Sequence, residues 1–164
     1  MSRPPATDVN GETPMPVRMC HQIEIRCTAE KLFNYVTQPW RWHEWHPDSK
    51  GASAGGQSLS VGDTFDETIE VRPLPPLPVT ITRHPRYVVR ESVPNSRWLA
   101  VGSFSDGWLS FLYEIEPTDA GVLFRRTMQF NVKGLMRLMV PLLTMKQQRK
   151  SRTALAALKR LMEA

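Results

Sequence analysis

Polar residues that could do chemistry occupy positions that an alternating pattern assigns to the apolar faces of predicted strands. Arg126 alternates with Phe124 and Met128, and Glu67 shares a face with Ile69. A guanidinium in an apolar interior costs several kcal/mol unless a carboxylate, a ligand anion or water compensates its charge. The sequence therefore predicts that Arg126 lines a cavity. Its expected partner is Glu67, directly or through water, or else the polar group of a ligand.

Two further polar side chains fall on predicted inward faces. Tyr113 lies in register with Phe111 and Ile115, and His21 lies in register with Ile23. General acid–base catalysis by such groups requires a perturbed pKa. The pattern places the groups but does not show how they titrate, so binding and catalysis both stay open.

A β-bulge would change the orientation of Arg126. One extra residue in a strand reverses which side chains face inward, so that Arg125 would turn in and Arg126 would reach solvent. The sequence alone does not distinguish the continuous strand from the bulged one.

The segment WRWHEWHP, residues 40–47, concentrates aromatic and histidine side chains. His43 and His46 are three residues apart, whereas the zinc-protease pattern needs histidines four apart and a third ligand elsewhere. We therefore predict no metal site. Trp45 is expected to be buried, with Trp40 and Trp42 at the mouth of a cavity as a lid. The alternative is that all three rings plug one end of the fold.

The C-terminal segment carries the excess positive charge. Residues 133–164 hold eight Lys or Arg against Glu163 alone, a net charge of +7, whereas residues 1–17 and 18–132 each sum to −1. A basic amphipathic helix can lie on an anionic membrane. The favoured interpretation is instead that its apolar stripe faces a sheet and its charges face water. Exposed side chains at Leu135, Met136, Met139 and Leu142 would favour the membrane.

The segments that must position these residues show either the apolar period of a strand or that of a helix. A strand over 20–27 precedes a short helix that begins after Thr28 and ends before Pro39, and residues 39–47 add a second helical turn. Strand patterns then cover 64–71, 79–82, 87–90, 98–101, 109–115 and 122–130, and a long helix starts near Pro141. Short connections make consecutive strands antiparallel. The fold class is α+β: a curved antiparallel sheet of about seven strands that grips the C-terminal helix.

Composition and charge argue against several other classes of protein. Residues 1–17 contain four prolines and no apolar periodicity, so we expect a disordered tail before one domain at 18–164. Cys20 and Cys27 point to opposite faces of one strand, so no disulfide is expected. No segment resembles a membrane span or a signal peptide, which favours a cytoplasmic protein. The localised charge argues against nucleic acid as a partner.

The order of elements resembles the START/polyketide cyclase–dehydrase (SRPBCC) superfamily, which has the helix-grip fold. The resemblance rests on TAEKLFNYVTQPWRWHEWHP, VGDTF and YEIEPTDAGVLFRRTMQF, and covers residues 18–164. It implies a seven-stranded sheet around the C-terminal helix and a cavity for hydrophobic ligands between them. Members of the superfamily include carriers, receptors and cyclases that share no catalytic residue set, so the resemblance assigns no catalytic residue here.

We therefore expect a binding or carrier protein for a hydrophobic small molecule: a lipid, an aromatic or a polyketide-like compound. The alternative is a cyclase/dehydrase-type enzyme that uses Glu67, Arg126, Tyr113 or His21, and a second alternative is a membrane-associated lipid-handling protein. No cofactor is expected, and the oligomeric state is open. The expected ligand-binding residues are Phe65, Glu67, Ile69, Trp98, Phe111, Tyr113, Phe124, Arg126, Met128 and Trp45.

Overall fold

The computed structural model describes residues 15–54, 58–72 and 77–164. The elements, in chain order, are β1 (Val17–Ile25), α1 (Ala29–Val36), η1 (Pro39–Glu44), β2 (Ser49–Ala52), β3 (Thr64–Val71), β4 (Ile81–Arg83), β5 (Arg86–Val93), β6 (Arg97–Phe104), β7 (Gly107–Thr118), β8 (Gly121–Val132), η2 (Gly134–Met139) and α2 (Val140–Glu163). Most of the predicted tail, residues 1–14, lies outside the described residues.

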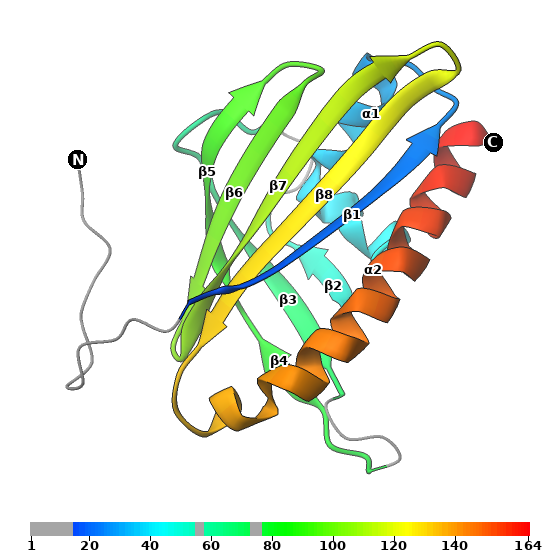
Figure 1. Cartoon of the computed structure of the whole chain (residues 1–164). Helices are drawn as coiled ribbons and strands as arrows, with labels where there is room; N and C mark the ends of the chain where they lie inside the picture. The colour runs from blue at the N-terminus through cyan, green and yellow to red at the C-terminus, as the bar shows by residue number, and fades with distance from the viewer. Residues whose placement is uncertain (1–14, 55–57, 73–76) are drawn as a thin grey trace.

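The strands form one curved antiparallel sheet in the order β1-β8-β7-β6-β5-β3-β2, and β4 pairs with β3 beside this path. Helix α2 runs along one side of the sheet, next to β1, and α1 lies near the C-terminal end of α2 (Figure 1). This is the helix-grip arrangement that the sequence predicts: seven strands in a continuous order, two short helical segments and a long C-terminal helix.

Local signals explain where α1 and the β7–β8 hairpin begin and end. The Thr28 side chain accepts a hydrogen bond from the Lys31 backbone N–H at 3.1 Å, which caps α1 as predicted. Gly121, the first residue of β8, has φ +148°, and a Cβ there would overlap the backbone of Ile25. Only glycine therefore fits this turn beside the end of β1.

Strand β2 was not expected. It lies where the Gly/Ser-rich stretch begins, and its pairing with β3 is interrupted by an irregularity between Ser49 and Gly51. The strand has four residues, three of them small, and carries no alternation that a sequence pattern could detect. The strand exists because β3 offers it an edge to pair with.

The register of β8 is continuous on both sides. It pairs without a shift with β1 and β7, so Phe124, Arg126 and Met128 share the inward face. Arg125 points to the other face, where its guanidinium donates to Glu116 at 3.1 Å. The bulged alternative is thereby excluded for β8, and the register shifts among the described strands lie in β2, between Ser49 and Gly51, and in β5, between Val89 and Glu91.

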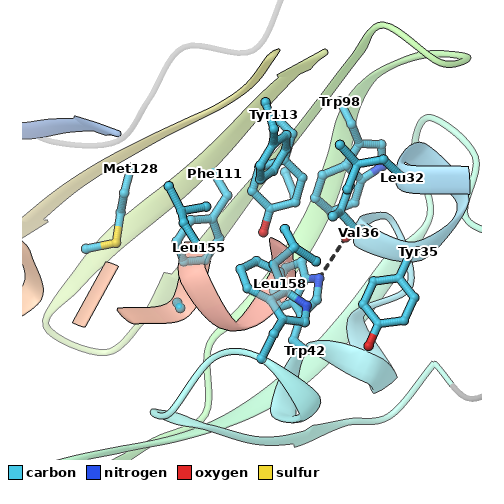
Figure 2. Packing of buried hydrophobic residues seen from close by; sticks show 14 of the residues in the cluster. Leu32, Tyr35, Val36, Trp42, Trp98, Phe111, Tyr113, Met128, Leu155 and Leu158 are labelled. Carbon is cyan, nitrogen blue, oxygen red and sulfur yellow. Dashed lines mark hydrogen bonds between the residues drawn. The ribbon is translucent and has the colours of Figure 1, made fainter. Parts of the chain in front are cut away.

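Aromatic rings fill the end of the core beneath η1. The Trp42 ring meets five other rings edge-on, at centroid distances of 5.6 to 6.3 Å: Phe65, Tyr87, Trp98, Phe111 and Tyr113. Leu155 and Leu158 of α2 are buried in the same cluster (Figure 2). Such offset and edge-on contacts make a rigid, close-packed interior.

Candidate functional site

Arg126 lies at the centre of the enclosed space. In the sheet, Arg126 is paired opposite His21 of β1 and Tyr113 of β7, and it is 2% exposed. Nη1 donates to Ser151 Oγ of α2 at 3.1 Å, and the guanidinium carbon lies 4.6 Å from the centroid of the Phe111 ring. An arginine stays charged in a protein, so the fold buries a permanent positive charge between sheet and helix.

His46, in the loop after η1, makes a further contact with this guanidinium, which also interacts with the Tyr113 side chain. Its Nε2 is 3.2 Å from Arg126 Nη2. Since the guanidinium can only donate, Nε2 accepts and the ring proton is on Nδ1. The loss of water, together with the charges of Arg126 and Lys150, lowers the pKa of His46 well below its ordinary value. His46 is therefore a neutral acceptor and does not add positive charge.

Glu67 of β3 is buried nearby at 4% exposure. Tyr87 Oη donates to its Oε2 at 2.9 Å. Burial raises the pKa of Glu67 to about 7, although the side-chain hydrogen bonds with Ser49 and Tyr87 and the charge of Arg126 favour its ionised form. The predicted direct ion pair is not formed: no oxygen of Glu67 lies within 4.0 Å of an Arg126 nitrogen. Both side chains instead line one small cavity.

That cavity has a volume of about 20 Å³. It is lined by Trp42, Trp45, His46, Asp48, Ser49, Glu67, Ile69, Phe111, Tyr113 and Arg126. A space of this size holds about one water molecule, whereas pockets for small ligands typically span roughly 300–1,000 Å³. The structure therefore shows a closed interior, and the cavity is much smaller than the ligand pocket that the sequence predicts.

Two lining residues carry a buried polar atom that has no hydrogen-bond partner among the described residues. These atoms are Trp45 Nε1 and Arg126 Nε. Buried donors are nearly always satisfied in native proteins, because an orphaned one costs about 1–3 kcal/mol. A pair of such donors at one cavity fits an oxygen atom, either of water or of a ligand.

The segment that closes the cavity is tied to its surroundings at two points. Trp42 Nε1 donates to the Val36 carbonyl at 2.8 Å, the dashed contact in Figure 2. Asp48, which is also buried, pairs with Lys150 and accepts from Gln147 Nε2 at 3.0 Å, both on α2. The loop after η1 is thus attached to the C-terminal helix. Trp45 is buried and Trp42 lines the cavity, as expected of a lid or plug.

The predicted site residues divide into two groups. Trp45, Glu67, Ile69, Phe111, Tyr113 and Arg126 line the cavity together. Phe65, Trp98, Phe124 and Met128 are buried in the adjoining core and do not line it. His21 is half-buried opposite Arg126 and also lies outside the lining.

Sequence reasoning missed part of the polar centre. His46 was considered only as a metal ligand, and Asp48 and Ser49 were not considered at all. These residues come from a loop and an irregular strand, where no alternation indicates which side chains face inward. Among the described residues there is no group of three or more side chains arranged to hold a metal ion. Nor does any helix in that part of the chain have the length and hydropathy needed to cross a bilayer.

Solved structures with this fold are numerous. The Zhui aromatase/cyclase from Streptomyces sp. R1128 superposes with a TM-score of 0.70 at 12% identity, over 91% of this chain and 94% of that chain. A START superfamily protein from Mycobacterium smegmatis gives a TM-score of 0.67 at 14% identity, over 89% and 97%. The di-domain ARO/CYC StfQ of the steffimycin biosynthetic pathway gives 0.67 at 14%, over 90% and 51%. At such identities the likeness shows the fold alone.

Sequence comparison defines the family more closely. No curated protein matches the chain. The family model for polyketide cyclase/dehydrase and lipid transport proteins matches residues 16–163, nearly the whole described chain. The chain therefore belongs to the polyketide cyclase/dehydrase and lipid transport family, which confirms the START/SRPBCC resemblance of its sequence.

Proposed function

We propose that this protein binds a small hydrophobic molecule between the sheet and α2 and holds one oxygen of that ligand at Arg126. The observation that supports this most is the pair of unpartnered polar atoms, on Trp45 and Arg126, at one small cavity. The guanidinium there is hydrogen-bonded to the Ser151 hydroxyl and a neutral imidazole and interacts with Tyr113, and no carboxylate of a described residue forms an ion pair with it. A carboxylate, phenol or carbonyl oxygen of a ligand would complete its shell.

Ligand binding then requires the lid to open. The cavity holds about one water molecule, so the apolar body of a ligand must take the place of the Trp42 or Trp45 ring. The rings that now surround Trp42, among them Phe65 and Phe111, would pack against an aromatic or aliphatic ligand in the same way. We assign η1 and the loop to Asp48 as this lid.

A cyclase/dehydrase-type enzyme is the second candidate function, and the titration of Glu67 favours it. A carboxyl group with a pKa of about 7 can both accept and donate a proton near neutral pH. With a ligand carbonyl oxygen at Arg126, Glu67 could remove a proton from the adjacent carbon while the guanidinium stabilises the negative charge on oxygen. A binding protein does not need Glu67 to exchange a proton. Turnover of a bound ligand would therefore distinguish the enzyme from the carrier.

The role of Arg126 can be tested with paired ligands. Dodecanoic acid and dodecanol have the same chain length and differ in their polar group, and their affinities follow from displacement of an apolar fluorescent dye. Arg126→Met should weaken the acid by about 10- to 100-fold, the range of one charge-assisted hydrogen bond, and leave the alcohol within a few-fold. Arg125→Met, a neighbour on the outward face, is the matched control and should change neither affinity.

The same experiment can contradict the proposal. If the wild-type protein takes up no dye or fatty acid at concentrations on the order of 10 μM, a carrier role fails, because useful carriers bind at least this tightly. If Arg126→Met weakens the acid and the alcohol equally, the guanidinium shapes the pocket but does not hold the ligand oxygen.

A further inference from the structure

Helix α2 is divided into two halves with different surroundings. The buried residues of its C-terminal half are Ser151, Ala154, Leu155, Leu158 and Met162, which face the sheet. In the first half, the buried residue is Leu143. The apolar stripe that closes the fold therefore begins near residue 151, and the apolar residues before it need another explanation.

Three of those earlier apolar side chains are exposed. Leu138 of η2 is 78% exposed, Met145 is 72% exposed and Leu142 is 36% exposed. They are spaced four and three residues apart, which places them along one side of a helical segment. Figure 1 shows η2 and the first turns of α2, in orange, below the sheet and away from β1. Exposed apolar side chains that gather on one surface commonly mark an interaction site.

Basic residues surround this apolar row. Lys133, Arg137, Arg149 and Arg152 are exposed, and no ion pair joins any of them to another described residue. Arg149 lies four residues after Met145, on the same side of α2. No acidic residue occurs between 133 and 162. We call Leu138, Leu142, Met145 and these four basic residues the basic apolar face.

We propose that the basic apolar face binds the surface of a membrane that contains anionic lipids. Apolar side chains flanked by Lys and Arg are the composition of helices that lie at the boundary between headgroups and acyl chains. A second copy of this chain fits less well, because it would bring two uncompensated basic surfaces together. None of these residues lines the cavity around Arg126, so the inference is independent of the proposed ligand site.

This inference differs from the favoured interpretation of the sequence. The sequence predicts that the apolar stripe of residues 133–164 packs entirely against the sheet. Of the side chains named there as indicators, Leu142 is exposed, Met136 and Met139 are half-buried, and the Leu135 side chain is not described. Leu138 and Met145, the most exposed of the row, were not named.

Vesicle flotation of the full chain tests this surface. Two kinds of vesicle are compared: phosphatidylcholine alone, and phosphatidylcholine with phosphatidylglycerol. The wild-type protein should float with the anionic vesicles and lose binding as salt is raised. The double variant Arg137→Gln, Arg149→Gln should bind them about 25-fold more weakly, since each basic residue near such a surface strengthens binding about fivefold. Leu138→Gln with Met145→Gln should also abolish flotation.

Matched substitutions elsewhere control for charge and for folding. Arg90→Gln removes one exposed positive charge from β5, and Val93→Gln removes one exposed apolar side chain there, so both should float like the wild type. Any of the following results would overturn the proposal: no flotation of the wild type at low salt, equal binding to neutral vesicles, or equal loss in the controls. A dimer in sedimentation that Leu138→Gln with Met145→Gln dissolves, without vesicle binding, would assign the face to a second copy and refute it.

Discussion

The chemistry of the buried centre follows from an imbalance of charge around one residue. Arg126 is in contact with Ser151 and with a neutral His46, while the carboxyl group of Glu67 has a pKa of about 7 and is only partly ionised at neutral pH. Asp48, the other buried acid, is already paired with Lys150. A buried arginine with so little compensation is costly for stability, and the ligand oxygen that we propose there would complete the centre.

The raised pKa of Glu67 can be detected in the pH dependence of the free energy of unfolding. Its pKa is about 7 in the folded protein against 4.5 in the unfolded chain, so the folded state retains a proton that the unfolded state releases. The stabilisation from protonated Glu67 is complete below pH 4.5 and is lost as pH rises through about 7. The difference between these two pKa values corresponds to about 3 kcal/mol. Glu67→Gln cannot ionise and should escape this loss.

Urea unfolding between pH 5 and 8 measures the effect. Across this range, the free energy of unfolding of Glu67→Gln should rise relative to the wild type by up to about 3 kcal/mol. The lowered pKa of His46 acts in the opposite direction, since its contribution is lost as pH falls below 6.5, but both proteins retain His46 and the comparison removes it. A constant difference between the two proteins would show that Glu67 titrates normally.

At the scale of elements, the alternating strands were predictable and the lid was not. The patterns of β3, β7 and β8 place Glu67, Tyr113 and Arg126 on inward faces, and the continuous register of β8 confirms this for Arg126. His46, Asp48 and Ser49 reach the same cavity from a segment with no period. Their positions depend on contacts with β3 and α2 that are distant in sequence, so no local pattern could indicate them.

The contact of Asp48 with α2 should set the rate at which the lid opens. Asp48→Asn keeps an acceptor for Gln147 and removes the charge that pairs with Lys150. A partly buried ion pair of this kind stabilises the closed lid by about 1–2 kcal/mol, so its loss should raise the open population, and with it dye association, by about 5- to 30-fold.

Stopped-flow fluorescence with an apolar dye gives this rate. Glu116→Gln is the matched control, because it removes one acid from an ion pair with Arg125 on the far face of the sheet. Equal association rates in Asp48→Asn and the wild type would mean that this contact does not limit access, and that the ligand enters by another route.

At the scale of the whole molecule, α2 contributes to two different surfaces. Its C-terminal half closes the sheet over the aromatic core, while its first half and η2 present the basic apolar face. Four of the eight basic residues in 133–164 belong to the basic apolar face, whereas residues 18–132 sum to a net charge of −1. A protein that collects an apolar ligand at a membrane and encloses it behind a lid would use both surfaces together.

Native mass spectrometry of the protein purified from its host tests the central claim most directly. The claim predicts a bound species of defined added mass that is released in organic solvent, is apolar and carries an oxygen group. It further predicts that Arg126→Met from the same host retains much less of this species, while Arg125→Met retains it fully. A wild-type protein that is purified without any bound molecule, and that takes up none of the hydrophobic acids offered to it, would contradict the account.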